Sequence, residues 1–85
     1  MADRSPEECR RIVALAIAAG DSVPSATARF ADDPTAGFAD LGFDSLAFME
    51  FCIAIQSETG VELSVGAVEA MGSPEAVARH LGGLK

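Results

Sequence analysis

The chain has 85 residues, of which 13 are acidic and 6 are basic, so its formal net charge at pH 7 is −7. This length allows one small domain, residues 1–85, because typical domains contain about 100–200 residues. The negative charge argues against binding to nucleic acid or to an anionic membrane. With 49% hydrophobic residues the chain is too apolar for a disordered tail, and it has no apolar run of the ~18 residues that cross a bilayer. We expect a folded, monomeric protein. The charged N-terminus is followed by an amphipathic stretch with arginines and not by a signal-peptide core, so we expect it to be cytoplasmic.

The first predicted element is a helix over residues 6–19. Ser5 can cap it, Pro6 suits the first helical position, and Glu8 can complete a capping box with Ser5. Gly20 is a typical C-terminal stop. The apolar residues expected to face the core recur at three- and four-residue steps: Ile12, Leu15, Ala16 and Ala19.

Residues 20–44 are predicted to form a long loop. Glycine and proline recur there among serine, threonine and aspartate, so no long helix or regular strand fits. Asp33 and Pro34 are expected to start at most one short turn of helix. Long loops in small domains tend to be functional. We expect apolar anchors to hold this loop on the core: Val23, Phe30, Phe38, Leu41 and Phe43.

A second long helix is predicted over residues 45–59, with Asp44 or Ser45 as its cap and Gly60 at its end. One apolar stripe is expected to face the core: Phe48, Phe51, Cys52, Ile55 and Thr59. A second apolar line, next to Glu50, consists of Leu46, Met49 and Ile53. A helix in a domain this small cannot bury its whole circumference. The second line is therefore either covered by the long loop or exposed for a partner.

Two shorter helices follow. Ser64 can cap a helix through about residue 70, and a second Ser-Pro-Glu start at Ser73 precedes a last helix that ends at Gly82 and Gly83. The residues expected to face the core are Val65, Val68, Val77, Ala78 and Leu81. The sequence thus predicts an all-α fold, a small four-helix bundle of three main helices plus one short helix, with a long loop between helices one and two.

The sequence contains no strong pattern for a disulfide, a metal site or a catalytic centre. Cys9 and Cys52 lack the framework spacing of secreted disulfide domains, and we expect both to be reduced core residues. Neither has metal-ligand spacing, and His80 is the only histidine. Ser45 lacks the Gly-x-Ser-x-Gly elbow and the nearby base of a hydrolase nucleophile. We therefore expect no metal and no catalytic residue.

The charges are unevenly distributed along the chain. All six basic residues lie outside residues 30–78, and that stretch contains nine acidic residues. One interpretation is a solvated face that keeps the protein soluble. The other is a docking surface for basic partners.

The most informative segment is Asp40-Leu41-Gly42-Phe43-Asp44-Ser45-Leu46. It places a serine at the first turn of a helix, after a glycine turn, with an acid immediately before it. An isolated Asp-Ser pair would be interpreted as a helix cap. The whole segment, however, resembles the attachment motif of acyl carrier proteins, in which the serine after Leu-Gly-x-Asp carries 4′-phosphopantetheine. The resemblance extends over residues 6–82, including a Gly-Val-x-Leu-type loop from Gly60 to Leu63.

In that family a phosphopantetheinyl transferase moves the cofactor from coenzyme A to the serine, and the thiol of the cofactor then holds acyl intermediates as thioesters. The resemblance implies that Ser45 carries covalent 4′-phosphopantetheine and that Asp44 helps define the site for the transferase. It also implies a non-catalytic carrier that docks on basic patches of pathway enzymes such as a ketosynthase or an acyltransferase. The implied recognition face consists of Leu46, Met49, Glu50 and Ile53.

Two departures from the family pattern bear on the pathway. Ser64 stands where many members have a proline, and Gln56 and Ser57 replace a dense acidic run. These departures argue against a role in primary fatty-acid synthesis. Discrete carriers of bacterial polyketide pathways are the expected type, because the chain resembles them in its alanine and glycine richness and at Phe43, Ala47, Phe48 and Phe51. The alternatives are a carrier of fatty-acid synthesis, an aminoacyl or peptidyl carrier, and an unmodified helical protein-interaction domain.

Overall fold

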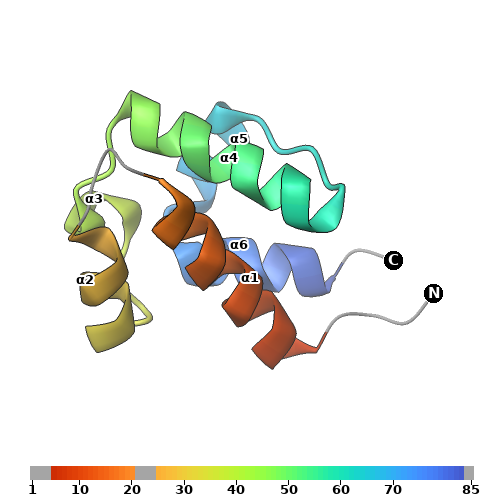
Figure 1. Ribbon diagram of the computed structural model, residues 1–85, viewed down its shortest axis with the longest axis horizontal. Helices are drawn as coiled ribbons and strands as arrows, with labels where there is room; N and C mark the ends of the chain where they lie inside the picture. The colour runs from red at the N-terminus through yellow and green to blue at the C-terminus, as the bar shows by residue number, and fades with distance from the viewer. Residues whose placement is uncertain (1–4, 21–24, 84–85) are drawn as a thin grey trace.

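The computed structural model describes residues 5–20 and 25–83, and in these residues the regular secondary structure is entirely helical. The helices are α1 (Pro6–Ala19), α2 (Ala26–Asp32), α3 (Phe38–Leu41), α4 (Ser45–Thr59), α5 (Val65–Met71) and α6 (Pro74–Gly82). Helix α1 packs against both α4 and α6, and α5 contacts the same two helices, as Figure 1 shows. The all-α prediction is confirmed. Over the described ranges, no helix has the length and apolar character needed to cross a membrane.

The helix starts follow from side-chain caps. Ser5 accepts a hydrogen bond from the backbone N–H of Glu8, and Ser64 and Ser73 cap α5 and α6 in the same way, through N–H groups three residues on. These bonds satisfy amide groups that have no partner inside the helix. The cap of α4 is Asp44 and not Ser45, which settles the choice that the sequence left open.

The segment between α1 and α4 is more ordered than a long loop. It contains α2, whose alanine-rich sequence favours a helix, and the single-turn α3. The expectation of a helical turn starting at Asp33 and Pro34 is wrong, because α2 ends at Asp32. The carboxylate of Asp33 instead accepts hydrogen bonds from the backbone N–H and the hydroxyl of Thr35, at 3.1 and 2.7 Å. These bonds lower the pKa of Asp33 and form a turn.

The predicted anchors hold this segment on the bundle. Phe38 and Leu41 are buried, whereas Phe30 and Phe43 are half-buried against the core, and Val23 lies outside the described residues. The backbone N–H of Phe38 also donates to the carbonyl of Gly72, at 3.0 Å, which ties α3 to the end of α5. The segment before α4 is therefore held on the bundle by Phe38 at the start of α3 and by Leu41 at its end.

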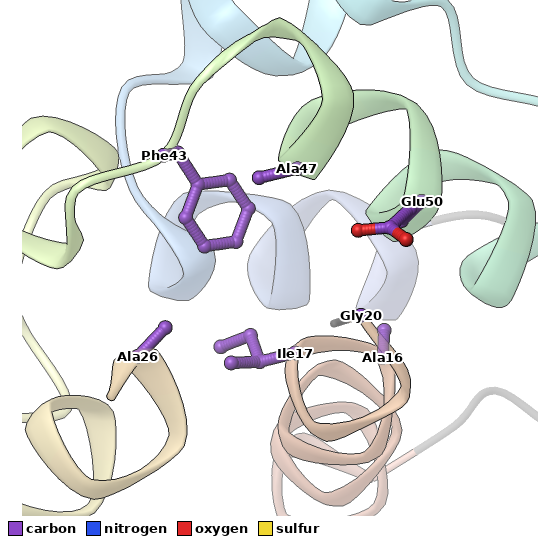
Figure 2. A pocket seen from close by; sticks show the side chains of 7 residues that line it. All are labelled: Ala16, Ile17, Gly20, Ala26, Phe43, Ala47 and Glu50. Atoms are coloured by element: carbon purple, nitrogen blue, oxygen red, sulfur yellow. The ribbon is translucent and has the colours of Figure 1, made fainter. Parts of the chain in front are cut away.

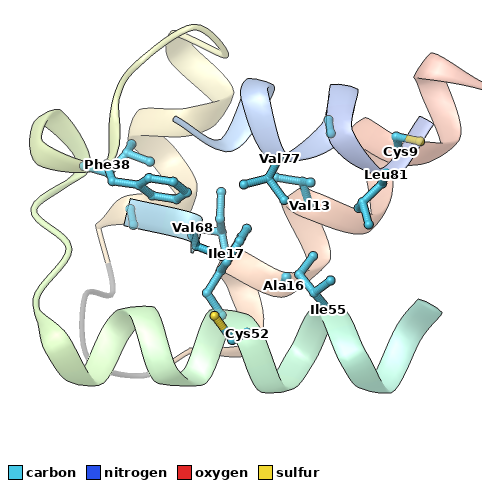
Figure 3. Packing of buried hydrophobic residues seen from close by; sticks show 14 of the residues in the cluster. Cys9, Val13, Ala16, Ile17, Phe38, Cys52, Ile55, Val68, Val77 and Leu81 are labelled. Atoms are coloured by element: carbon cyan, nitrogen blue, oxygen red, sulfur yellow. The ribbon is translucent and has the colours of Figure 1, made fainter. Parts of the chain in front are cut away.

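One apolar core joins the helices (Figure 3). The stripe predicted for α6 is confirmed, with Val77, Ala78 and Leu81 buried. Those predicted for α4 and α5 are confirmed for Phe51, Cys52, Ile55 and Val68, which are buried, whereas Phe48, Thr59 and Val65 are half-buried.

The stripe predicted for α1 is partly wrong. Its buried residues are Cys9, Val13, Ala16 and Ile17. Ile12 is half-buried, while Leu15 and Ala19 are exposed. Val13 and Ile17 are spaced as regularly as the predicted residues, so periodicity alone could not choose between two neighbouring stripes.

Cys9 and Cys52 are buried free thiols, as predicted. Burial raises the pKa of the Cys52 thiol, which disfavours the reactive thiolate. We expect a double Cys9→Ala, Cys52→Ala variant to lose about 1–2 kcal/mol of unfolding free energy in a urea titration, because each change leaves a small cavity. In the parent protein both thiols should react slowly with iodoacetamide when folded and rapidly in urea. Rapid alkylation of the folded protein, or a disulfide between the two residues, would contradict this result.

Candidate functional site

The sequence-predicted serine lies at an exposed corner of the bundle. Ser45 is the first residue of α4 and is exposed. The carboxylate of Asp44 accepts the hydrogen bond from the backbone N–H of Ala47, at 2.8 Å. Because Asp44 supplies the cap, the hydroxyl of Ser45 is not used for it. The corner therefore presents an accessible hydroxyl group.

A glycine and two side-chain hydrogen bonds stabilise α3 and the turn that leads from it to Ser45. Gly42 ends α3 with a φ of 79°, a left-handed conformation that favours glycine. The carboxylate of Asp40 accepts a hydrogen bond from the N–H of Gly37, at 3.2 Å, and the guanidinium group of Arg29 donates to the carbonyl of Asp40, at 3.1 Å. The first acid of the motif thus caps α3 and connects it to α2.

Four aromatic rings pack behind the corner. The ring of Phe38 lies 5.0 Å from that of Phe43, 5.1 Å from that of Phe48 and 5.5 Å from that of Phe51, measured between centroids. Phe43 also contacts both rings of α4. Tilted and edge-to-face pairs of this kind contribute about 0.5–1.5 kcal/mol each beyond the area they bury. Two of these residues precede Ser45 and two follow it, so the cluster fixes the corner against the core.

The second apolar line of α4 is exposed. Leu46, Met49 and Ile53 have exposed fractions of 55%, 51% and 64%. We refer to these three residues as the α4 face. The interpretation that the long loop covers this line is wrong, because α2 and α3 pack elsewhere, α2 against α1 and α3. Among the described residues, the remaining large and exposed hydrophobic side chain is Leu15 of α1.

Glu50 differs from the three residues of the α4 face, because it is half-buried. Its carboxylate points toward a shallow, open hollow between α1, α2 and the start of α4, as Figure 2 shows. This carboxylate lies next to Gly20 at the end of α1: a side chain at that position would place its Cβ atom 3.3 Å from a carboxylate oxygen of Glu50. The hollow is lined by Ala16, Ile17, Gly20, Ala26, Phe43, Ala47 and Glu50. Glu50 thus lies at the junction of α4 with α1, which the helical spacing alone did not indicate.

The acidic stretch is distributed over several elements. Asp33, Asp40 and Asp44 accept hydrogen bonds from backbone N–H groups in their own turns. Glu75 lies 3.6 Å from Arg10 and 3.8 Å from Arg79, at ion-pair distance. In the described part of the chain, no group of three or more His, Cys, Asp or Glu side chains is arranged to hold a metal ion.

The capping role of Asp44 can be tested by substitution. We expect Asp44→Ala to lower the unfolding free energy by about 0.5–2 kcal/mol, because an amide at the start of α4 loses its partner. Asp44→Asn keeps a side-chain oxygen as acceptor and serves as the matched control. The unfolding free energies of the two variants, measured by urea titration, should differ by most of that amount. Equal stability of Asp44→Ala and the parent would contradict the assignment.

The exposure of the α4 face predicts a contrast within one helix. Met49→Ala should change the unfolding free energy by no more than about 0.5–1 kcal/mol, because an exposed side chain loses little packing. Phe51→Ala, two residues away and 1% exposed, should cost about 3–5 kcal/mol. Thermal or urea unfolding measures both. A large loss for Met49→Ala would place Met49 in the core and contradict the exposure described above.

Comparison with known proteins identifies the type of domain. Residues 25–81 match the family model of the phosphopantetheine attachment site. This match covers the corner, the α4 face and the helices from α2 through nearly all of α6, whereas α1 lies before it. Neither the curated proteins nor the solved structures gave a significant match.

Proposed function

The chain belongs to the phosphopantetheine attachment-site family, whose members carry a covalently attached 4′-phosphopantetheine group, and we propose that Ser45 is the attachment residue. The observation that carries this proposal is the exposed serine at the start of α4, whose neighbour Asp44 supplies the helix cap. A serine needed for capping would have its hydroxyl engaged by the backbone. Ser45 has its hydroxyl accessible to a modifying enzyme.

The corner fits the cofactor chemically. A phosphodiester on Ser45 would place its negative charge at the N-terminus of a 15-residue helix, where the helix dipole favours an anion. When attached, the cofactor supplies a thiol that can hold an acyl group as a thioester. The protein's own contribution is to fix the position of Ser45 through the aromatic cluster and to expose it.

We propose that the α4 face, with Glu50 at its edge, forms the recognition surface. Carrier domains are generally non-catalytic, are modified by a phosphopantetheinyl transferase and interact with the enzymes of their pathway. The exposed line of Leu46, Met49 and Ile53 starts one residue after the attachment serine. An enzyme that binds it would have the cofactor close to its active site. Asp44 lies on the other side of Ser45 and is the residue that the transferase would use to define the site.

The pathway assignment is a finer proposal. The bulky Phe48 and Phe51 favour a discrete polyketide carrier, with a ketosynthase and an acyltransferase among its partners. Gln56 and Ser57, in place of a dense acidic run, argue against a carrier of primary fatty-acid synthesis. Residues 30–78 contain nine acidic residues and no lysine or arginine. This negative charge favours partners with basic docking patches, because opposite charges steer association. A carrier of fatty-acid synthesis and an aminoacyl or peptidyl carrier are the alternatives.

Modification of Ser45 can be measured by intact mass after incubation with coenzyme A and a broad-specificity transferase. The parent should gain the mass of one phosphopantetheinyl group, and Ser45→Ala should gain none. Ser57→Ala, which removes another exposed serine of α4, is the matched control and should be modified like the parent. Ser45→Ala should stay within about 0.5 kcal/mol of the parent in stability, because Asp44 is the cap.

Two results would reject the proposal. A mass gain in Ser45→Ala equal to that of the parent would place the attachment elsewhere. A parent that gains no mass, although a known carrier in the same reaction does, would favour an unmodified helical interaction domain.

A further inference from the structure

The backbone of Phe38 joins the end of α5 to the segment that leads to Ser45. Its N–H donates to the carbonyl of Gly72, at 3.0 Å, and its carbonyl accepts from the N–H of Phe43, at 3.1 Å. Phe43 precedes Ser45 by two residues. Two hydrogen bonds therefore connect Gly72, the residue that caps the end of α5, with the corner that exposes the serine.

The hydrogen bond between Phe38 and Gly72 satisfies an amide that would otherwise be unpaired. Phe38 is the first residue of α3, so its N–H has no partner inside that helix. The residue is 3% exposed, which leaves the amide little access to water, and a buried amide without a partner destabilises a fold. Gly72 has a φ of 84°, and this left-handed conformation sets the direction of its carbonyl group. The contact therefore depends on the backbone geometry of both segments.

Gly37 allows the two backbones to come this close. A Cβ atom at position 37 would lie 3.2 Å from the carbonyl oxygen of Gly72, a separation at which one of the two segments has to move by a few tenths of an ångström. The φ of −77° and ψ of 164° at Gly37 suit other residues as well. A side chain there would therefore disturb the close approach to Gly72, and with it the hydrogen bond of the next residue, Phe38.

We infer that the end of α5 positions Ser45 for modification, through the contact of Gly37 with Gly72 and the two hydrogen bonds of Phe38. This inference rests on the proposed function, since it concerns the reaction at Ser45. In that reaction the Oγ atom of Ser45 attacks the phosphorus of coenzyme A that bears the pantetheine. The bond from this phosphorus to the bridging oxygen breaks, adenosine bisphosphate leaves, and the hydroxyl proton passes to a base of the transferase.

The reaction depends on the placement of the attacking oxygen, because this oxygen has to lie in line with the leaving group. A displaced corner should therefore lower kcat. Gly37 and Gly72 act through the backbone that leads to Ser45, so they are positioning residues. Their disturbance should leave the KM for the carrier nearly unchanged, because the side chains around Ser45 remain the same.

The test uses two substitutions at Gly37, assayed by steady-state phosphopantetheinyl transfer to the apo protein with coenzyme A saturating and the carrier concentration varied. Gly37→Ala adds the Cβ atom, and Gly37→Val adds a larger, branched side chain at the same place. Gly60→Ala is the matched control for lost stability, because Gly60 has a φ of 75°, lies at the far end of α4 and has nothing within 4 Å of an added Cβ atom. Gly66→Ala, in α5, is the control for a side chain that meets nothing within 4 Å.

We expect Gly37→Ala to lower kcat at least about threefold and Gly37→Val to lower it further, with KM within about twofold of the parent, because a misplacement of about 1 Å can cost about 10²-fold in rate. Gly60→Ala should be less stable in a urea titration, yet it and Gly66→Ala should keep kcat within about twofold of the parent. Measured by NMR, the amide of Phe38 should exchange slowly with deuterium in the parent and faster in Gly37→Val. Circular dichroism checks that each variant is folded.

The inference is overturned if Gly37→Val has the kcat of the parent, if Gly60→Ala loses as much kcat as Gly37→Ala, or if the Gly37 variants raise KM and leave kcat unchanged. Fast exchange of the Phe38 amide in the parent, or equally slow exchange in Gly37→Val, would also overturn it. Each of these results leaves Ser45 as the attachment residue as long as the parent is modified there. A parent that is not modified at all rejects the proposed function and the inference with it.

Discussion

The hydrogen bond from the N–H of Ala47 to the carboxylate of Asp44 determines how the site is built. It starts α4 at Ser45 and leaves the serine hydroxyl outside the capping interaction. A serine in the capping position would use its side-chain oxygen to accept a hydrogen bond from a backbone N–H group. Asp44 thus initiates the helix, and the adjacent Ser45 exposes its hydroxyl group.

The rest of the bundle fixes this corner in space. The ring of Phe38 contacts three other rings from both sides of Ser45 in the sequence, and its backbone N–H reaches the end of α5. Helix α1 packs against both α4 and α6, and α5 contacts the same two helices. With one side of α4 committed to this core, the opposite side is left exposed as the α4 face. Placement of the serine and exposure of the face therefore have the same structural origin.

Much of this arrangement could be predicted from the sequence, where single residues determine local structure. The starts at Ser5, Ser64 and Ser73 and the stop at Gly60 were predictable because caps and left-handed glycines act locally. Helix α2 was not, because it has one fully buried residue, Ala26, and so shows no apolar periodicity. The rotation of α1 and the orientation of Glu50 depend on how the helices pack, which spacing along one helix cannot determine.

The most direct test of the account is fragmentation mass spectrometry of the parent protein after reaction with coenzyme A and a transferase. We expect the phosphopantetheinyl group on Ser45 and on no other serine of the chain. Fragment ions that place the group on another serine, with Ser45 unmodified, would contradict the central claim that the corner at the start of α4 is the attachment site.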